Sequence, residues 1–138
     1  MQKKSLLLEK CPTGIQGLDE ITQGGLPMGR PTLVCGSAGC GKTLLAMEFL
    51  ARGAVQYKEP GVFIAFEENA AELAQNVASL GFDLVDLARK KKILVDYVYI
   101  DRSEIEETGA YDLEGLFVRL DHAIRSINAK RVALDSIE

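Results

Sequence analysis

The chain has 138 residues, of which 47% are hydrophobic and 26% charged, and this suits one soluble globular domain or part of one. The composition excludes a disordered chain, and no apolar run approaches the length needed to cross a membrane. The net charge of -4 argues against a constitutive nucleic-acid binder, because such proteins usually carry a basic face.

The N-terminal apolar stretch is too short for the hydrophobic region of a signal peptide, since only four uncharged residues separate Lys4 from Glu9. We therefore expect the protein in the cytoplasm. The segment 15–22, which is flanked by glycines, predicts a short helix. The apolar, β-branched run 31–35 has no polar alternation and predicts a first strand that is covered on both faces.

The middle of the chain predicts a helix, a strand and another helix in turn. Apolar residues recur at helical spacing over 43–56, and a buried strand is expected over 62–66. The segment 69–81 predicts a second helix with Asn69 as its N-cap and a glycine at its end. The following residues, 82–92, are expected to add a short helical turn.

The last third of the chain repeats this alternation. We expect a strand over 93–101, a polar loop over 102–111, an amphipathic helix over 112–128 capped by Asp112, and a final strand over 131–135. Strands that alternate with helices predict parallel βαβ units. The expected fold class is therefore α/β, with a mostly parallel sheet and helices on both of its faces.

The sequence GSAGCGKT follows the first expected strand directly and precedes the first long helix. It fits the pattern G-x-x-x-x-G-K-[ST] at Gly36, Gly41, Lys42 and Thr43, in the strand–loop–helix context that the pattern requires. Glycines let the backbone N–H groups turn toward phosphates, and the helix N-terminus adds its positive dipole end. The pattern predicts a phosphate-binding loop in which Lys42 reaches the β and γ phosphates.

Carboxylates and a hydroxyl are available for Mg²⁺ and for hydrolysis. Thr43 and Asp135, which ends the apolar run RVALD, offer the hard oxygen ligands that Mg²⁺ prefers. Glu67 and Glu68 follow the second expected strand, at the edge where α/β proteins bind ligands. We expect Glu67 to be the general base, with Glu68 as a supporting or alternative base. The plainer interpretation is that the pair only favours the start of the next helix.

Other polar features have plainer interpretations. The thiol of Cys40 could be redox-sensitive because it precedes a helix, or a small residue could simply fit there. The three cysteines form no CxxC pair, and we expect them to be reduced. The basic run 89–92 is expected to be a solvated loop, and His122 a solvent-facing helix residue.

The order of these motifs resembles the KaiC family of RecA-like ATPases. The segments that carry the resemblance are TGIQGLDEITQGGLPMGRPTLVCGSAGCGKT, then EPGVFIAFEE, then YDLEGLFVRLDHAIRSINAKRVALDS, and they are most similar to the N-terminal ATPase domain of that family. The resemblance implies a RecA-like P-loop fold that assembles into a homo-oligomeric ring, usually a hexamer. It also implies ATP and Mg²⁺ at subunit interfaces, slow hydrolysis, regulatory partners, and a possible second domain with serine/threonine autokinase activity.

The resemblance also implies site residues. Thr43 matches the magnesium ligand, and Glu67 with Glu68 match the catalytic pair. Residues expected at the nucleotide are Gly36, Ser37, Ala38, Gly39, Cys40, Gly41, Lys42, Thr43, Leu44 and, from its alignment position alone, Ser79.

The sequence departs from the family pattern after Asp135, where only three residues follow. A RecA-like sheet inserts a further strand between the Asp135 strand and the phosphate-loop strand. We therefore expect residues 1–138 to be the N-terminal part of a single ATPase domain that lacks its C-terminal strands and binds nucleotide weakly or not at all alone. A RecA/RadA-type DNA recombinase and a nucleotide-gated oligomeric scaffold with little hydrolysis remain alternatives.

Overall fold

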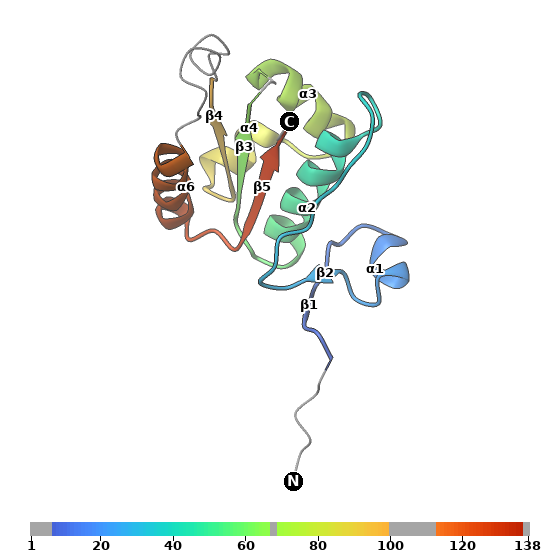
Figure 1. Cartoon of the computed structure of the whole chain (residues 1–138). Coiled ribbons are helices and arrows are strands. Elements are labelled where there is room, and N and C mark those ends of the chain that lie inside the picture. The colour runs from blue at the N-terminus through green and yellow to red at the C-terminus, as the bar shows by residue number, and fades with distance from the viewer. Residues whose placement is uncertain (1–6, 67–68, 100–112, 137–138) are drawn as a thin grey trace.

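The computed structural model describes residues 7–66, 69–99 and 113–136, and its core is one parallel sheet between helices (Figure 1). The strands are β3 (Gly61–Ala65), β4 (Ile93–Tyr97) and β5 (Arg131–Asp135), in the order β4-β3-β5. Ala65 lies opposite Tyr97 on one side and Asp135 on the other, so the carboxyl ends of the strands are level. This level edge is where the loops expected to bind ligand begin.

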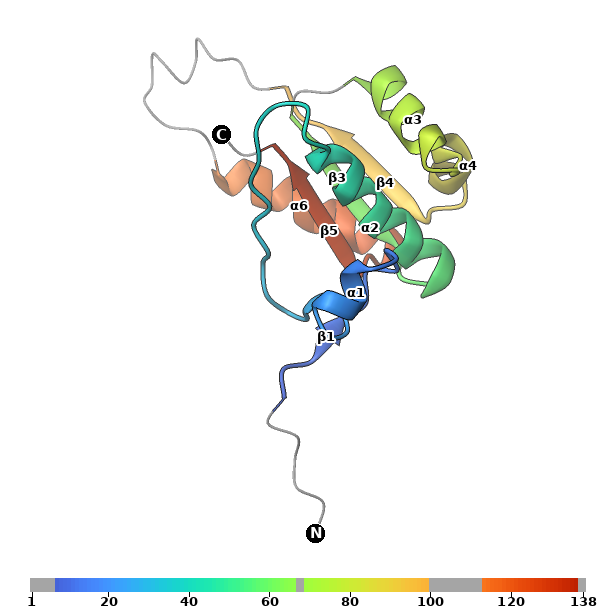
Figure 2. The ribbon, with the colours of Figure 1, turned by 90° about the vertical axis from the view of Figure 1, so that its right-hand side faces the viewer.

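Helices cover both faces of the sheet, as expected (Figure 2). On one face, α2 (Lys42–Gln56), α3 (Ala70–Ser79) and α4 (Leu84–Arg89) bury one core cluster against the sheet. On the other face, α6 (Leu113–Ile127) packs over alternate residues of the same strands. The five residues of β3 are all buried because β3 is covered on both faces and paired at both edges. The predicted α/β class and the parallel sheet are thus confirmed.

The helix starts follow from capping residues. Asn69 lies in an extended conformation, and its side chain accepts a hydrogen bond from the Glu72 N–H at 2.9 Å, which confirms it as the N-cap of α3. Asp83 caps α4 in the same way. Gly81, at a φ of +87°, ends α3 in the left-handed region that glycine tolerates best. The expected cap Asp112 and the loop 102–111 lie outside the described residues.

The prediction of a strand over 31–35 is wrong for this structure. These residues form no regular secondary structure and are exposed, and Figure 2 shows them as a plain trace that arches toward the start of α2. A strand needs a neighbour for its backbone hydrogen bonds. Within the described part of the chain, β5 pairs only with β3, and no strand lies beside 31–35. The apolar run therefore has the composition of a buried strand but nothing to pair with.

The N-terminal residues form a small lobe beside α2. Its strands β1 (Lys10–Cys11) and β2 (Leu26–Pro27) pair antiparallel, a contact too short for sequence patterns to indicate. The helix expected over 15–22 is the single turn α1 (Leu18–Ile21). Among residues 7–66, 69–99 and 113–136, no helix has the length and apolar character of a membrane span.

Candidate nucleotide site

The phosphate loop sits at the amino end of α2 and turns through two glycines. Gly39 and Gly41 have φ angles of +78° and +98°, a conformation that L side chains rarely adopt. Gly41 is the N-cap of α2, and Lys42 is its first residue. The turn therefore delivers Lys42 and Thr43 to the first turn of a fifteen-residue helix, where unpaired backbone N–H groups point toward the loop.

Thr43 and Asp135 meet across the carboxyl edge of the sheet. The Thr43 hydroxyl donates a hydrogen bond of 2.6 Å to the Asp135 carboxylate, across 92 positions of sequence. One residue comes from the first turn of α2 and the other from the last position of β5. The fold thus brings together the two residues that were expected to bind the metal.

Lys42 closes the loop on itself. Its ammonium group donates a hydrogen bond of 2.6 Å to the Gly36 carbonyl, so the last part of the loop is tied to its first residue. A Cβ atom on Gly36 would collide with the Sγ atom of Cys40, so Cys40 also folds back over the start of the loop. The loop is exposed, and both Cys35 and Cys40 carry exposed free thiols.

The remaining predicted site residues lie in or beside the loop, at the end of α3, or outside the described residues. Ser37 and Ala38 lie in the exposed loop and Leu44 in the first turn of α2. Glu67 and Glu68 lie outside the described residues, although β3 before them and Asn69 after them are described. Ser79 ends α3, about 15 Å along the helix from its start, and its hydroxyl donates to the Asn76 carbonyl at 2.6 Å. A role for Ser79 at the nucleotide stays a prediction.

The donor set at this edge suits Mg²⁺ with a nucleotide. A hydroxyl and a carboxylate are hard oxygen donors, and Mg²⁺ is usually held by one or two protein groups, with waters and phosphates completing its shell. In the described parts of the chain, no group of three or more His, Cys, Asp and Glu side chains is placed to hold a metal by itself. The site therefore fits a metal that arrives with phosphates.

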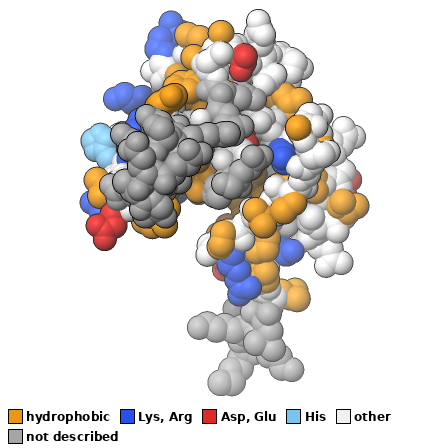
Figure 3. Space-filling model, turned by 45° about the horizontal axis from the view of Figure 1, so that its top comes forward, with side chains coloured by type: hydrophobic (Ala, Val, Ile, Leu, Met, Phe, Trp, Pro, Cys, Tyr) orange, Lys and Arg blue, Asp and Glu red, His pale blue; other side chains and the backbone are white. Residues whose placement is uncertain are grey.

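The surface around the site carries mixed side chains. Figure 3 turns the carboxyl edge of the sheet toward the reader, and Lys and Arg side chains lie there in separate places among hydrophobic and neutral ones. The view shows no single basic patch outside the area that grey atoms cover.

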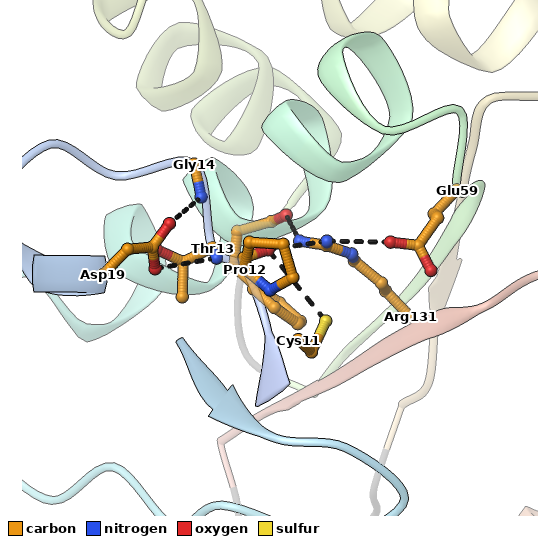
Figure 4. A network of polar contacts seen from close by, with 8 residues as sticks. Cys11, Pro12, Thr13, Gly14, Asp19, Glu59 and Arg131 are labelled. Carbon is orange, nitrogen blue, oxygen red and sulfur yellow. Dashed lines mark hydrogen bonds and ion pairs between the residues drawn. The ribbon is translucent and has the colours of Figure 1, made fainter. Parts of the chain in front are cut away.

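A second polar cluster, which the sequence did not indicate, lies at the opposite end of β5 (Figure 4). Arg131 is 2% exposed and pairs with Glu59 at 2.9 Å and with the Pro12 carbonyl at 2.7 Å. Two sequence signals could have pointed to it, namely a charge at the start of an apolar strand and Gly53 inside a helix.

Next to Arg131, the N-terminal lobe is held by one carboxylate. Asp19 accepts hydrogen bonds from the N–H and hydroxyl of Thr13, at 2.9 and 2.6 Å, and from the N–H of Gly14 at 2.9 Å. Desolvation raises the pKa of Asp19, but these hydrogen bonds and the charge of Arg131 outweigh it, and the net pKa lies below its usual value. Burial raises the pKa of the nearby Cys11 thiol, partly offset by Arg131.

A glycine-rich loop at a helix N-terminus, with a threonine of that helix bonded to an aspartate that ends a parallel strand, is the arrangement of the P-loop fold. The family described as "ATPase: KaiC" matches residues 11–138. The chain therefore belongs to the KaiC ATPase family, and its fold is the RecA-like P-loop fold expected from the resemblance.

Curated relatives agree with this assignment. The circadian clock protein KaiC2 of Synechocystis sp. (strain ATCC 27184 / PCC 6803 / Kazusa) is 67% identical over 135 residues, which cover 98% of this chain and 24% of the relative. The circadian clock oscillator protein KaiC of Parathermosynechococcus lividus is 45% identical over 130 residues, which cover 94% of this chain and 24% of the relative. The chain thus spans about a quarter of the length of the curated relatives it matches.

Proposed function

We propose that this chain binds ATP with Mg²⁺ and contributes to ATP hydrolysis as part of a KaiC-family ATPase. The observation that carries the proposal is the 2.6 Å hydrogen bond between Thr43 and Asp135. It joins the helix that follows the phosphate loop to the acidic end of β5, where the Thr43 hydroxyl and the Asp135 carboxylate would hold a metal. Family membership supports the same activity.

Each residue of the site has a distinct task in this proposal. The N–H groups around Gly39 and Gly41 and the amino end of α2 bind phosphate oxygens. Lys42 exchanges its contact with the Gly36 carbonyl for the β and γ phosphates. Thr43 and Asp135 would hold Mg²⁺, whose charge would help to neutralise the phosphates. Glu67, supported by Glu68, orients and deprotonates the attacking water.

The assembled protein is proposed from family membership and from the length of the relatives. We infer that residues 1–138 are the N-terminal part of a single ATPase domain and that the full-length protein forms a homo-oligomeric ring, usually hexameric in this family. The relatives are named as circadian clock proteins, and we propose a signalling role of that kind with regulatory protein partners. A second domain with serine/threonine autokinase activity belongs to the same proposal.

We propose that residues 1–138 alone bind nucleotide only weakly. The segment before the phosphate loop is exposed and unpaired within the described residues, so its ordering would have to accompany binding. Binding that includes such ordering is weaker than binding to a preformed site.

The experiment that tests the function measures phosphate release and assembly by the full-length protein with Mg²⁺ and ATP. We expect slow phosphate release and ATP-dependent ring formation. Ring formation with no phosphate release over hours would contradict the hydrolytic function and favour a nucleotide-gated scaffold. Release that depends on single-stranded DNA would favour a recombinase instead.

A further inference from the structure

Arg131 is a buried charge that joins parts of the chain far apart in sequence. Within the described residues, Arg131 and Thr13 are the polar side chains that are buried. Burial of a guanidinium group is costly unless it is paired and hydrogen-bonded. Its Nη2 atom donates to the Pro12 carbonyl at 2.7 Å and to the Glu59 carboxylate at 2.9 Å. The guanidinium is therefore fixed by the N-terminal lobe and by the residues before β3.

Helix α2 and its C-cap residue Tyr57 supply the other contacts of Arg131. The Nη1 atom donates to the Phe49 carbonyl at 3.2 Å, and the guanidinium lies over the rings of Phe49 and Tyr57 at 4.6 and 5.3 Å from their centroids. Gly53 leaves room for it, since a Cβ atom there would lie 2.5 Å from the Cδ and Nε atoms of Arg131. Gly53 thus lets the backbone of α2 approach the first residue of β5.

Side-chain contacts therefore connect α2 to both ends of β5. Arg131 opens β5 and contacts α2 around Phe49 and Gly53, whereas Asp135 closes β5 and contacts Thr43. The four residue-to-residue steps of strand from Arg131 to Asp135 span about 13 Å. The ten steps of helix from Thr43 to Gly53 span about 15 Å. Because the two lengths are similar, the contacts of Arg131 at one end of β5 can determine how Thr43 and Asp135 meet at the other end.

From this geometry we propose that Arg131 is a positioning residue for the nucleotide site. By fixing the height of α2 along β5, it sets the separation between the Thr43 hydroxyl and the Asp135 carboxylate, on which Mg²⁺ binding depends. The inference rests on the proposed function, because it gives those two residues a metal to hold. It assigns Arg131 no contact with nucleotide or metal.

The test compares ATP affinity with Mg²⁺ and with EDTA, by calorimetric titration of the full-length protein. Arg131→Met removes every polar contact of the side chain, and Arg131→Lys keeps the charge but cannot bond three acceptors in a planar fork. The matched control is Arg125→Met on α6, whose side chain is 79% exposed and pairs with Asp121. Thermal unfolding of each variant checks that it is folded.

We expect Arg131→Met to lower the Mg²⁺-dependent gain in ATP affinity by about tenfold, the scale on which groups supporting metal ligands act. Affinity in EDTA should change much less, Arg131→Lys should lie between, and Arg125→Met should match the unsubstituted protein. A folded Arg131→Met protein that keeps the full Mg²⁺ gain, or loses both affinities in parallel, overturns the inference.

A second variant keeps the inference testable if Arg131→Met does not fold. Glu59→Gln removes the ion pair while preserving side-chain shape, and the same selective loss of the Mg²⁺ gain is expected at smaller size. A Glu59→Gln protein and an Arg131→Lys protein that both keep the full gain overturn the inference. Failure of the proposed function looks different, because the unsubstituted protein would then show no Mg²⁺-dependent ATP affinity.

Discussion

The hydroxyl of Thr43 lies 2.6 Å from the carboxylate of Asp135, although 92 positions of sequence separate them. The contact exists because β5 is the parallel neighbour of β3 and ends level with it, while α2 begins at the same edge. The fold therefore brings these two oxygen groups together before any ligand arrives.

Substitution of Lys42 should weaken nucleotide binding. In the structure the ammonium group is bonded to the Gly36 carbonyl, a neutral acceptor that phosphates would replace. Lys42→Met keeps the stem of the side chain and removes the charge, and we expect ATP affinity of the full-length protein to fall at least tenfold. Fluorescent-nucleotide titration measures it. The exposed lysine Lys58, substituted in the same way, serves as control, and equal affinities for both variants would contradict the assignment.

The glutamate pair should separate binding from turnover. The combined change of Glu67→Gln and Glu68→Gln retains size and removes the base, so we expect ATP affinity within about threefold of the unsubstituted protein and a loss of phosphate release by 10² or more. Single-turnover assays follow the release. Unchanged phosphate release would contradict the assignment of the general base. A loss of ATP affinity as large as the loss of phosphate release would indicate a structural role for the pair.

Gly53 should not tolerate a methyl group. Alanine is favoured over glycine in a helix interior by about 1 kcal/mol. Against this, the added Cβ atom would lie 2.5 Å from a guanidinium that hydrogen bonds hold in place, and overpacking of this kind costs about 1–3 kcal/mol. We expect Gly53→Ala to lower the melting temperature in calorimetry. Gly115→Ala, at an exposed position of α6, is the control and should not lower it.

The lobe around Asp19 should weaken in acid. Its pKa is lowered in the folded protein, so its stabilising effect is complete above the unfolded value near 3.9 and is lost as the pH falls through the folded value. We expect the free energy of unfolding of Asp19→Asn to lie below that of the unsubstituted protein at pH 7, and the difference between the two to shrink as the pH falls below about 4. Urea titrations from pH 3 to 7 measure both. A gap that does not shrink in acid would contradict the role of the charge.

Local sequence signals predicted most elements of the fold. The cap at Asn69 and the glycine at Gly81 fixed the ends of α3, and the apolar run of β3 had no other plausible structure. The prediction of a strand over 31–35 is wrong because a strand depends on partner strands, which the residues of the segment itself do not encode.

Sequence signals likewise predict some residues of the site and miss others. The phosphate loop and Asp135 follow from motif and position, and their meeting follows from parallel strand order. Ser79 is the last residue of α3, and its expected place near the nucleotide, which rests on alignment position alone, stays a prediction. The charge at the start of β5 and Gly53 inside α2 hint at Arg131, but its partners Pro12 and Glu59 could not be predicted, because they lie on segments distant in sequence that only packing brings together.

The most direct test of the account is the ATP affinity of the full-length protein with Mg²⁺ and with EDTA, before and after Asp135→Asn. The asparagine can still accept a hydrogen bond from Thr43 but lacks the charge that holds a divalent cation. We predict that Mg²⁺ raises the affinity of the unsubstituted protein and that this gain falls at least tenfold in the variant. An equal Mg²⁺ gain in both proteins would contradict the proposal that Thr43 and Asp135 form the metal side of an ATP site.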